Sequence, residues 1–199
     1  MALRLPRAAE REFIAAANVQ AIYVAALPTG PSYVSTSRDL YHSLLALRRR
    51  WNGIRIISAH WVEGKTGARL ICREVNASLP RGTSGLLAAN AKAARRCVEN
   101  VAARMNVTLT DHADIMHRAG AAVAFVEDHI REAEANGELR WFNQAYRTWR
   151  LAAKAEGRSM TYAEARARLR RRMFRDALSS RCQEVSKPIF PPLRTLNLR

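Results

Sequence analysis

"AIYVAALPTGPSYVSTS", residues 21–37, is the stretch from which the fold can be predicted. Its first part, AIYVAAL, is short, apolar and rich in strand-forming residues, and Pro28 ends it. The run TGPS at 29–32 supplies turn residues, and SYVSTS follows as a second segment with strand character. We therefore expect a β-hairpin that carries one tyrosine on each strand, Tyr23 and Tyr33.

The residues after this hairpin predict a helix, a strand and a second helix. Asp39 can cap a helix over residues 40–51, in which apolar side chains recur at helical spacing. Residues 54–63 are typical of a third strand, with Ile54, Ile56 and Ser58 on one face. Residues 64–79 predict a helix that ends before Pro80. The expected order is β, β, α, β, α within residues 20–80, which makes the fold class α+β.

Beyond residue 86 the pattern changes, because alanine, arginine and glutamate dominate and no further strand is predicted. Helices are expected at about 86–105, 111–135, 138–157 and 161–178, the last with a capping box formed by Thr161 and Glu164. The predicted organisation is an N-terminal arm or helix (1–19), a small α+β domain (20–80), a basic all-helical region (86–180) and a Pro-containing extended tail (181–199).

The charge of the chain points to a polyanionic partner. Its 33 lysines and arginines against 17 acids give a net charge of +16 and a pI near 11.2, more than solubility requires. We expect this partner to be nucleic acid, and DNA in particular. The alternative explanation is that this chain comes from a proteome whose proteins are generally rich in arginine, so that the composition reflects no particular partner.

Other features of the composition limit the remaining classes of site and partner. No stretch approaches 18 apolar residues and the N-terminus mixes arginine with glutamate, so we expect neither a membrane partner nor a signal peptide, and a cytoplasmic location. The three cysteines and five histidines form no cluster at metal-ligand spacing. We therefore expect no cofactor from the residues alone.

Basic residues are concentrated in the last two predicted helices. Residues 139–175 carry eleven bases against Glu156 and Glu164, whereas residues 111–138 carry seven acids against two arginines. A helix with aromatic residues on one side can pack on the protein and leave guanidinium groups for phosphates. The candidate nucleic-acid-binding residues are Arg140, Arg147, Arg150, Lys154, Arg166, Arg170, Arg171 and Arg175.

The ββαβα order and its paired tyrosines resemble the GIY-YIG nuclease family. The first motif of that family corresponds to AIY at 21–23, the second to YVS at 33–35, and TSRDL follows as the run into the first helix. The resemblance covers residues 20–80. It implies metal-dependent cleavage of a phosphodiester, with a tyrosine as base or water-orienting group, an arginine on the first helix and a metal-binding glutamate on the second.

Carried over to this chain, the resemblance assigns catalytic positions to Tyr23 and Tyr33, and two partner positions differ. Ser43 stands where the family has its arginine, and Cys72 lies closest to the position of the metal-binding acid. Glu74 is the nearest carboxylate, although two residues rotate it by about 200° around a helix. Glu74 would hold Mg²⁺ if the protein were active, and Glu63 is a further candidate.

Three interpretations follow from these observations. The first is a nucleic-acid-binding protein on a GIY-YIG-like scaffold whose cleavage is impaired or absent. The second is an active metal-dependent endonuclease that uses Tyr23, Tyr33, a displaced arginine and Glu74 around Mg²⁺. The third is an assembly subunit whose basic helices bind an acidic protein partner or an RNA scaffold.

Overall fold

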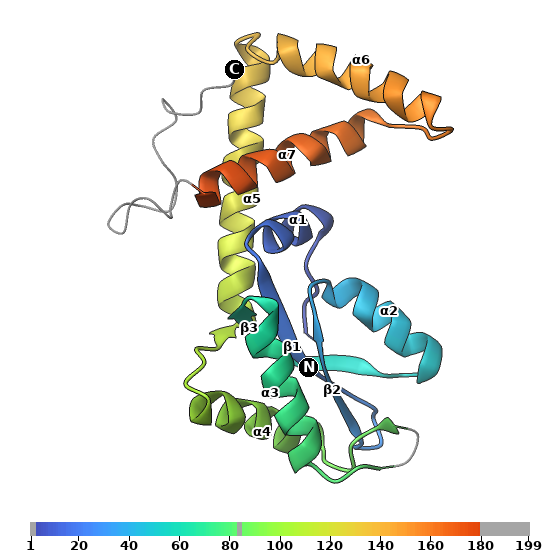
Figure 1. Cartoon of the computed structure of the whole chain (residues 1–199), viewed down its shortest axis with the longest axis vertical. Helices are drawn as coiled ribbons and strands as arrows, with labels where there is room; N and C mark the ends of the chain where they lie inside the picture. Colours follow the sequence, from blue (N-terminus) through green and yellow to red (C-terminus); the bar gives the residue numbers. More distant parts are fainter. Residues whose placement is uncertain (1–2, 83–84, 180–199) are drawn as a thin grey trace. The chain divides into compact units, whose positions relative to one another are not determined.

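The computed structural model describes residues 3–82 and 85–179 and divides the chain into two units, Met1–Ala119 and Gly120–Arg199 (Figure 1). The first unit contains an antiparallel sheet, which places the fold in the α+β class as expected. Among the described residues, no helix combines the length and the apolar character needed to cross a bilayer. The expected tail at 181–199 lies outside the described residues.

The sheet of unit 1 has four strands in the order β2-β1-β3-β4. The strands are β1 (Val19–Ala26), β2 (Ser32–Ser37), β3 (Arg55–Glu63) and β4 (Thr110–Asp111). β1 and β2 form the predicted hairpin, closed where the Gly30 N–H donates to the Leu27 carbonyl at 3.1 Å. Gly30 has a φ of +109°, a conformation that side chains other than glycine's rarely adopt.

Helices cover both faces of this sheet. α1 (Ala8–Ala16), α2 (Leu40–Arg50) and the first turns of α5 (His112–Ala135) pack on one face. α3 (Lys65–Ser78) and α4 (Ala91–Arg104) pack on the other, as Figure 1 shows. β1 is therefore buried on both sides: Ala21, Tyr23 and Ala25 face the first core, whereas Ile22 and Val24 face the second. This double burial explains why the sequence of β1 is almost continuously apolar.

The expected element order over residues 20–80 is observed. α2 begins at the predicted cap, where the Asp39 side chain accepts from the N–H groups of Tyr41 and His42. α3 ends at Ser78, two residues before Pro80. A helix also occupies part of the N-terminal segment, because α1 spans Ala8–Ala16 before β1 begins.

A bulge in β3 corrects the expected face of Ser58. The pairing with β1 shifts between Val24, which lies opposite Ser58, and Ala25, which lies opposite Ile56. Ile57 is the extra residue of this bulge and is 38% exposed. Ile54 and Ile56 share the first core with Ala59 and Trp61, whereas Ser58 lies opposite Val24 of the second core. A strict alternation along the sequence cannot reveal such a change of phase.

The region from residue 86 onward is not entirely helical, which corrects a second expectation. The short strand β4 pairs with β3 through His60–Asp111 and Trp61–Thr110. Leu87 forms a bridge with Ser32 instead of starting a helix, and α4 begins later, after the Asn90 cap. Both differences arise from pairing with strands that lie far away in the sequence.

Unit 2 contains the rest of α5, followed by α6 (Arg140–Ala155) and α7 (Tyr162–Ser179). These helices agree with the predicted ranges to within a few residues. The predicted capping box is present, since the Thr161 N–H donates to Glu164 and the Glu164 N–H donates to the Thr161 hydroxyl. Phe142 and Phe174 are buried, and the Tyr162 ring contacts Phe142 and Tyr146.

Candidate functional site

The two tyrosines of the hairpin lie on the same face of the sheet as a diagonal pair. Tyr23 pairs with Ser35 and Tyr33 pairs with Ala25, so the two residues are offset by two positions across the ladder. Their ring centroids are 6.4 Å apart, and the Tyr33 ring lies 5.3 Å from that of Trp51 at the end of α2. The ten-residue spacing in the sequence thus becomes a cluster of three aromatic rings.

Tyr23 is buried, and its hydroxyl is surrounded by serines. Its exposed fraction is 4%. Burial raises the pKa of Tyr23 to about 12, and the neighbouring Tyr33 adds to the increase, while hydrogen bonds with Ser35 and Ser43 offset part of it. At neutral pH this hydroxyl stays protonated, which suits a hydrogen-bonding group better than a general base.

Ser43 and Cys72, which stand where the resemblance places an arginine and a metal-binding acid, are both engaged in hydrogen bonds. The Ser43 hydroxyl donates to the Ser37 hydroxyl at 2.7 Å. The Cys72 thiol lies 3.7 Å from the Val34 carbonyl, and the amide of Asn76 donates to the same carbonyl at 3.2 Å. Burial raises the pKa of the Cys72 thiol, so the group remains neutral. Neither residue supplies a charge to the tyrosine cluster.

Glu74 is exposed on α3, and its nearest ionic neighbour is Arg73, at 3.9 Å. No contact within residues 3–82 and 85–179 joins Glu74 to Tyr23 or Tyr33. Glu63 is exposed at the end of β3, where it pairs with Val19. In the described part of the chain, no three His, Cys, Asp or Glu side chains gather as a metal site would require. The structure therefore brings the tyrosines together with Ser43 and not with either carboxylate.

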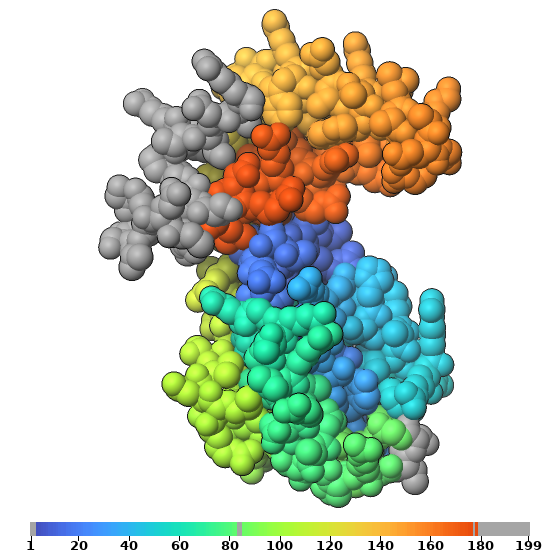
Figure 2. Space-filling model, in the orientation of Figure 1, coloured from blue at the N-terminus to red at the C-terminus, as the bar shows by residue number. Residues whose placement is uncertain are grey.

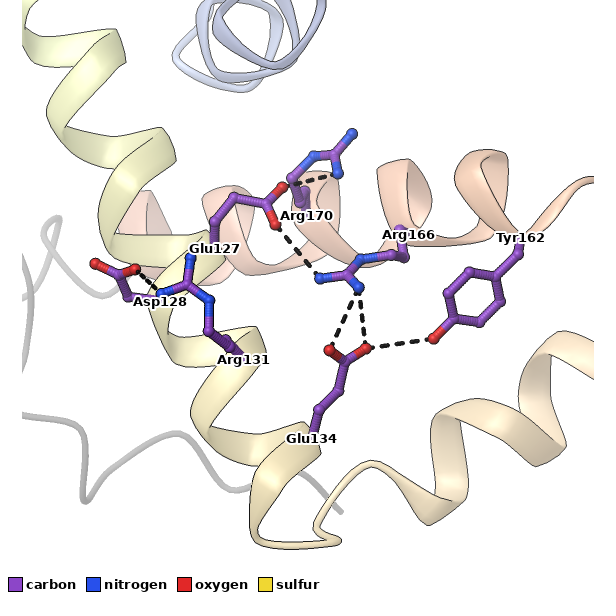
Figure 3. A network of polar contacts seen from close by, with 7 residues as sticks. All are labelled: Glu127, Asp128, Arg131, Glu134, Tyr162, Arg166 and Arg170. Carbon is purple, nitrogen blue, oxygen red and sulfur yellow. Dashed lines mark hydrogen bonds and ion pairs between the residues drawn. The ribbon is translucent and has the colours of Figure 1, made fainter.

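In unit 2, acids of α5 and bases of α7 form an ion-pair network (Figure 3). Arg166 contacts Glu134 at 3.1 Å and Glu127 at 3.4 Å, and Arg170 contacts Glu127 at 2.9 Å. The Tyr162 hydroxyl donates to Glu134 at 3.3 Å. Two of the predicted nucleic-acid-binding arginines are thus engaged by carboxylates of their own chain.

The predicted bases of α6 have a different environment. Arg140, Arg147, Arg150 and Lys154 are all exposed, and α6 contains no acidic residue. At 3.6 residues per turn, the four positions fall within an arc of about 80° around the helix. None of them forms an ion pair with another described residue. Figure 2 shows side chains of α6 projecting from the surface of unit 2. We call these four residues the α6 basic row.

The outer side of α7 adds further positive charge. Arg171 and Arg175 are exposed, and their Nε–H groups donate to the carbonyls of Ala167 and Arg171. The Arg168 guanidinium lies 4.6 Å from the centroid of the Trp149 ring, a cation–π contact between α7 and α6. The candidate residues named from the sequence did not include this arginine, because its contact with Trp149 depends on how α6 and α7 pack.

Comparisons with family models, with curated proteins and with solved structures found no match for this chain.

Proposed function

We propose that the protein binds nucleic acid, in particular DNA, through the phosphate backbone. The α6 basic row carries this proposal, because four cations that have no carboxylate partner among the described residues share one face of a helix. Such a row accumulates repulsion unless anions approach it, and a polymer with regularly spaced phosphates is a suitable counterion. The net charge of +16 agrees with the same partner.

Within this proposal the basic residues of unit 2 have two roles. The α6 basic row, together with Arg171 and Arg175, contacts phosphates. Arg166 and Arg170 instead hold α7 against α5, since their side chains are only 26% and 16% exposed and pair with Glu127 and Glu134. Contacts to phosphates carry little sequence information, so binding should be similar for different sequences.

We further propose that the α+β unit is a GIY-YIG-like scaffold on which cleavage is impaired or absent. Three observations support this proposal: the hydroxyl of Tyr23 is buried and stays protonated, Ser43 and Cys72 occupy the positions of charged groups, and Glu74 is not in contact with the tyrosines. A phosphodiester in its transition state gains negative charge, which neutral hydroxyl and thiol groups stabilise poorly.

The phosphate-binding role can be tested by salt-dependent binding to a labelled duplex. In the variant Arg147→Gln/Arg150→Gln/Lys154→Gln, the slope of log K against log salt should become shallower by about 0.9 for each phosphate that the variant no longer neutralises. Arg131→Gln/Arg158→Gln is a control in the same unit, because these bases are exposed and already paired with Asp128 and Glu156. Equal slopes in the wild type and the α6 variant would refute the proposed role of the row.

Cleavage is tested in the same samples with Mg²⁺, with Mn²⁺ and with EDTA. We expect a mobility shift without cutting under all three conditions. Metal-dependent cutting that disappears in Tyr33→Phe and Glu74→Gln would instead establish the endonuclease interpretation.

A further inference from the structure

Unit 1 carries a basic surface of its own, which the concentration of charge in the C-terminal helices obscures in the sequence. Seventeen bases and eight acids lie in Met1–Ala119, compared with sixteen bases and nine acids in Gly120–Arg199. Both units are therefore cationic. The excess of bases over acids in unit 1 is separate from the α6 basic row, because that row belongs to unit 2.

The end of α2 holds the densest group of these charges. Arg48, Arg49 and Arg50 are consecutive, exposed, and not ion-paired with any residue in the described part of the chain. α2 contains no acid. Cations in the last turn of a helix interact favourably with its dipole, which contributes about 0.3–1 kcal/mol. One cation would suffice to interact with the helix dipole, whereas three adjacent cations repel each other.

The exposed side of α2 extends this group into a stripe with mixed character. Tyr41 is 43% exposed and Leu45 is 39% exposed, and with Arg48 they fall within an arc of about 60° around the helix. The Arg11 guanidinium lies 4.8 Å from the centroid of the Tyr41 ring, and that of Arg50 lies 4.5 Å from the Trp51 ring. These two arginines are held by aromatic rings beside the stripe, whereas no ring contact or ion pair with a described residue engages Arg48 or Arg49.

We infer that the stripe Tyr41, Leu45, Arg48 and Arg49, the α2 surface, is a second phosphate-binding surface for nucleic acid, independent of the α6 basic row. This inference rests on the proposed function and adds that one chain holds two duplex segments. Two such surfaces on one chain convert the second binding event on a long nucleic acid into an intramolecular one, so affinity rises with the length of the nucleic acid.

The test is the number of short DNA duplexes bound per chain at low salt, measured by sedimentation with a labelled duplex of roughly ten base pairs. The intact chain should bind two duplexes, and Arg48→Gln/Arg49→Gln should bind one. Arg48→Lys/Arg49→Lys keeps the charge and should bind two. The matched control is Lys92→Gln/Arg96→Gln, which removes the same charge from exposed positions on α4, over the opposite face of the sheet.

The outcomes separate the inference from the proposed function. One duplex on the intact chain, or two on Arg48→Gln/Arg49→Gln, overturns the inference. If the α6 variant still loses affinity in either case, the proposed function stands without it. No binding by the intact chain overturns both. The circular dichroism spectrum and thermal midpoint of each variant confirm that the exposed substitutions leave the fold intact.

Discussion

At the scale of single residues, the protein buries several titratable groups in its α+β unit. Tyr23 occupies the first core, and His60 and His112 lie on and beside the sheet at 5% and 8% exposure. Burial opposes ionisation of each of these groups, so the native state favours their neutral forms. The pH dependence of stability therefore reports on these residues.

Replacing Tyr23 by phenylalanine should lower the free energy of unfolding by about 1 kcal/mol, since hydrogen bonds with Ser35 and Ser43 are removed while the ring remains. In the wild type, the pKa of Tyr23 is raised from about 10 in the unfolded chain to about 12 in the native state. The contribution of Tyr23 to the free energy of unfolding is complete below pH 10 and is lost as the pH rises through 12. Urea unfolding between pH 8 and 12 measures both effects, and a wild type whose stability falls no more than that of Tyr23→Phe would contradict them.

Acid should destabilise the protein through two histidines. His112 accepts from the indole N–H of Trp61 at 3.2 Å through Nδ1, so its Nε2 carries the proton and donates to the Arg4 carbonyl at 2.7 Å. Burial lowers the pKa of His112, and a nearby backbone carbonyl offsets only part of this effect. Burial also lowers the pKa of His60, although the carboxylates of Glu99 and Asp111 partly oppose it and Arg95 reinforces it.

Both contributions have the same sign. Just below pH 6.5 the unfolded chain binds more protons than the native state. The histidines therefore contribute fully to the free energy of unfolding above that pH, and this contribution is lost as the pH decreases through their lowered native pKa values. Thermal midpoints between pH 5 and 7.5 should show this decrease. His60→Leu, which has no titrating group at this position, should have a flatter profile; a profile as steep as that of the wild type would remove His60 from the explanation.

At the scale of elements, α7 is held by two carboxylates of α5. Glu127 and Glu134 are seven residues apart, which places them two turns apart on one face of a helix, and the bases that they contact, Arg166 and Arg170, are one turn apart. These side chains are between 16% and 35% exposed. Solvent screens ion pairs at this exposure only in part, so they contribute more than typical surface pairs.

Glu127→Gln should therefore destabilise unit 2 by about 1 kcal/mol, because two partly buried guanidinium groups lose a charged partner. Asp128→Asn is the neighbouring control, since the pair formed by Asp128 and Arg131 is exposed and should contribute less than about 0.5 kcal/mol. Hydrogen exchange of the α7 amides in the native state measures the difference. Equal protection in the two variants would show that the network does not hold α7.

At the scale of the whole molecule, positive charge is distributed over both units, and this distribution affects stability. Like charges on a compact chain repel each other, so the native state with a net charge of +16 should be more stable in the presence of polyanions. A ligand that binds only the folded chain also stabilises it by mass action.

A random-sequence duplex should therefore raise the thermal midpoint at low salt, and the increase should diminish with added salt as the phosphate contacts are screened. Free inorganic phosphate at the same phosphate concentration is the comparison, because it screens charge but does not present several linked phosphates in one molecule. An equal effect of phosphate and duplex would show that general screening, and not binding of the polymer, accounts for the stabilisation.

Much of the architecture could be predicted from the sequence because the signals are local. The apolar run at 21–27, the turn residues at 29–32 and the cap at Asp39 each act within a few residues, and β1, β2 and α2 form where they indicate. The helices α5, α6 and α7 follow from periodicity, which also requires no knowledge of the partner elements. The net positive charge is likewise a property of composition alone.

Tertiary structure decided the features that depend on contacts between distant residues. The bulge at Ile57, the pairing of β4 with β3 and the bridge from Leu87 to Ser32 follow from strand partners, which periodicity does not reveal. The difference between Arg166 and Arg147 has the same origin, because both are arginines of basic helices and only one lies within reach of Glu127 and Glu134. Sequence by itself determined which residues are charged and where the first three strands and most of the helices form. Packing determined which charges are paired within the protein and which remain at its surface, because electrostatic interaction depends on distance in space and not on separation along the chain.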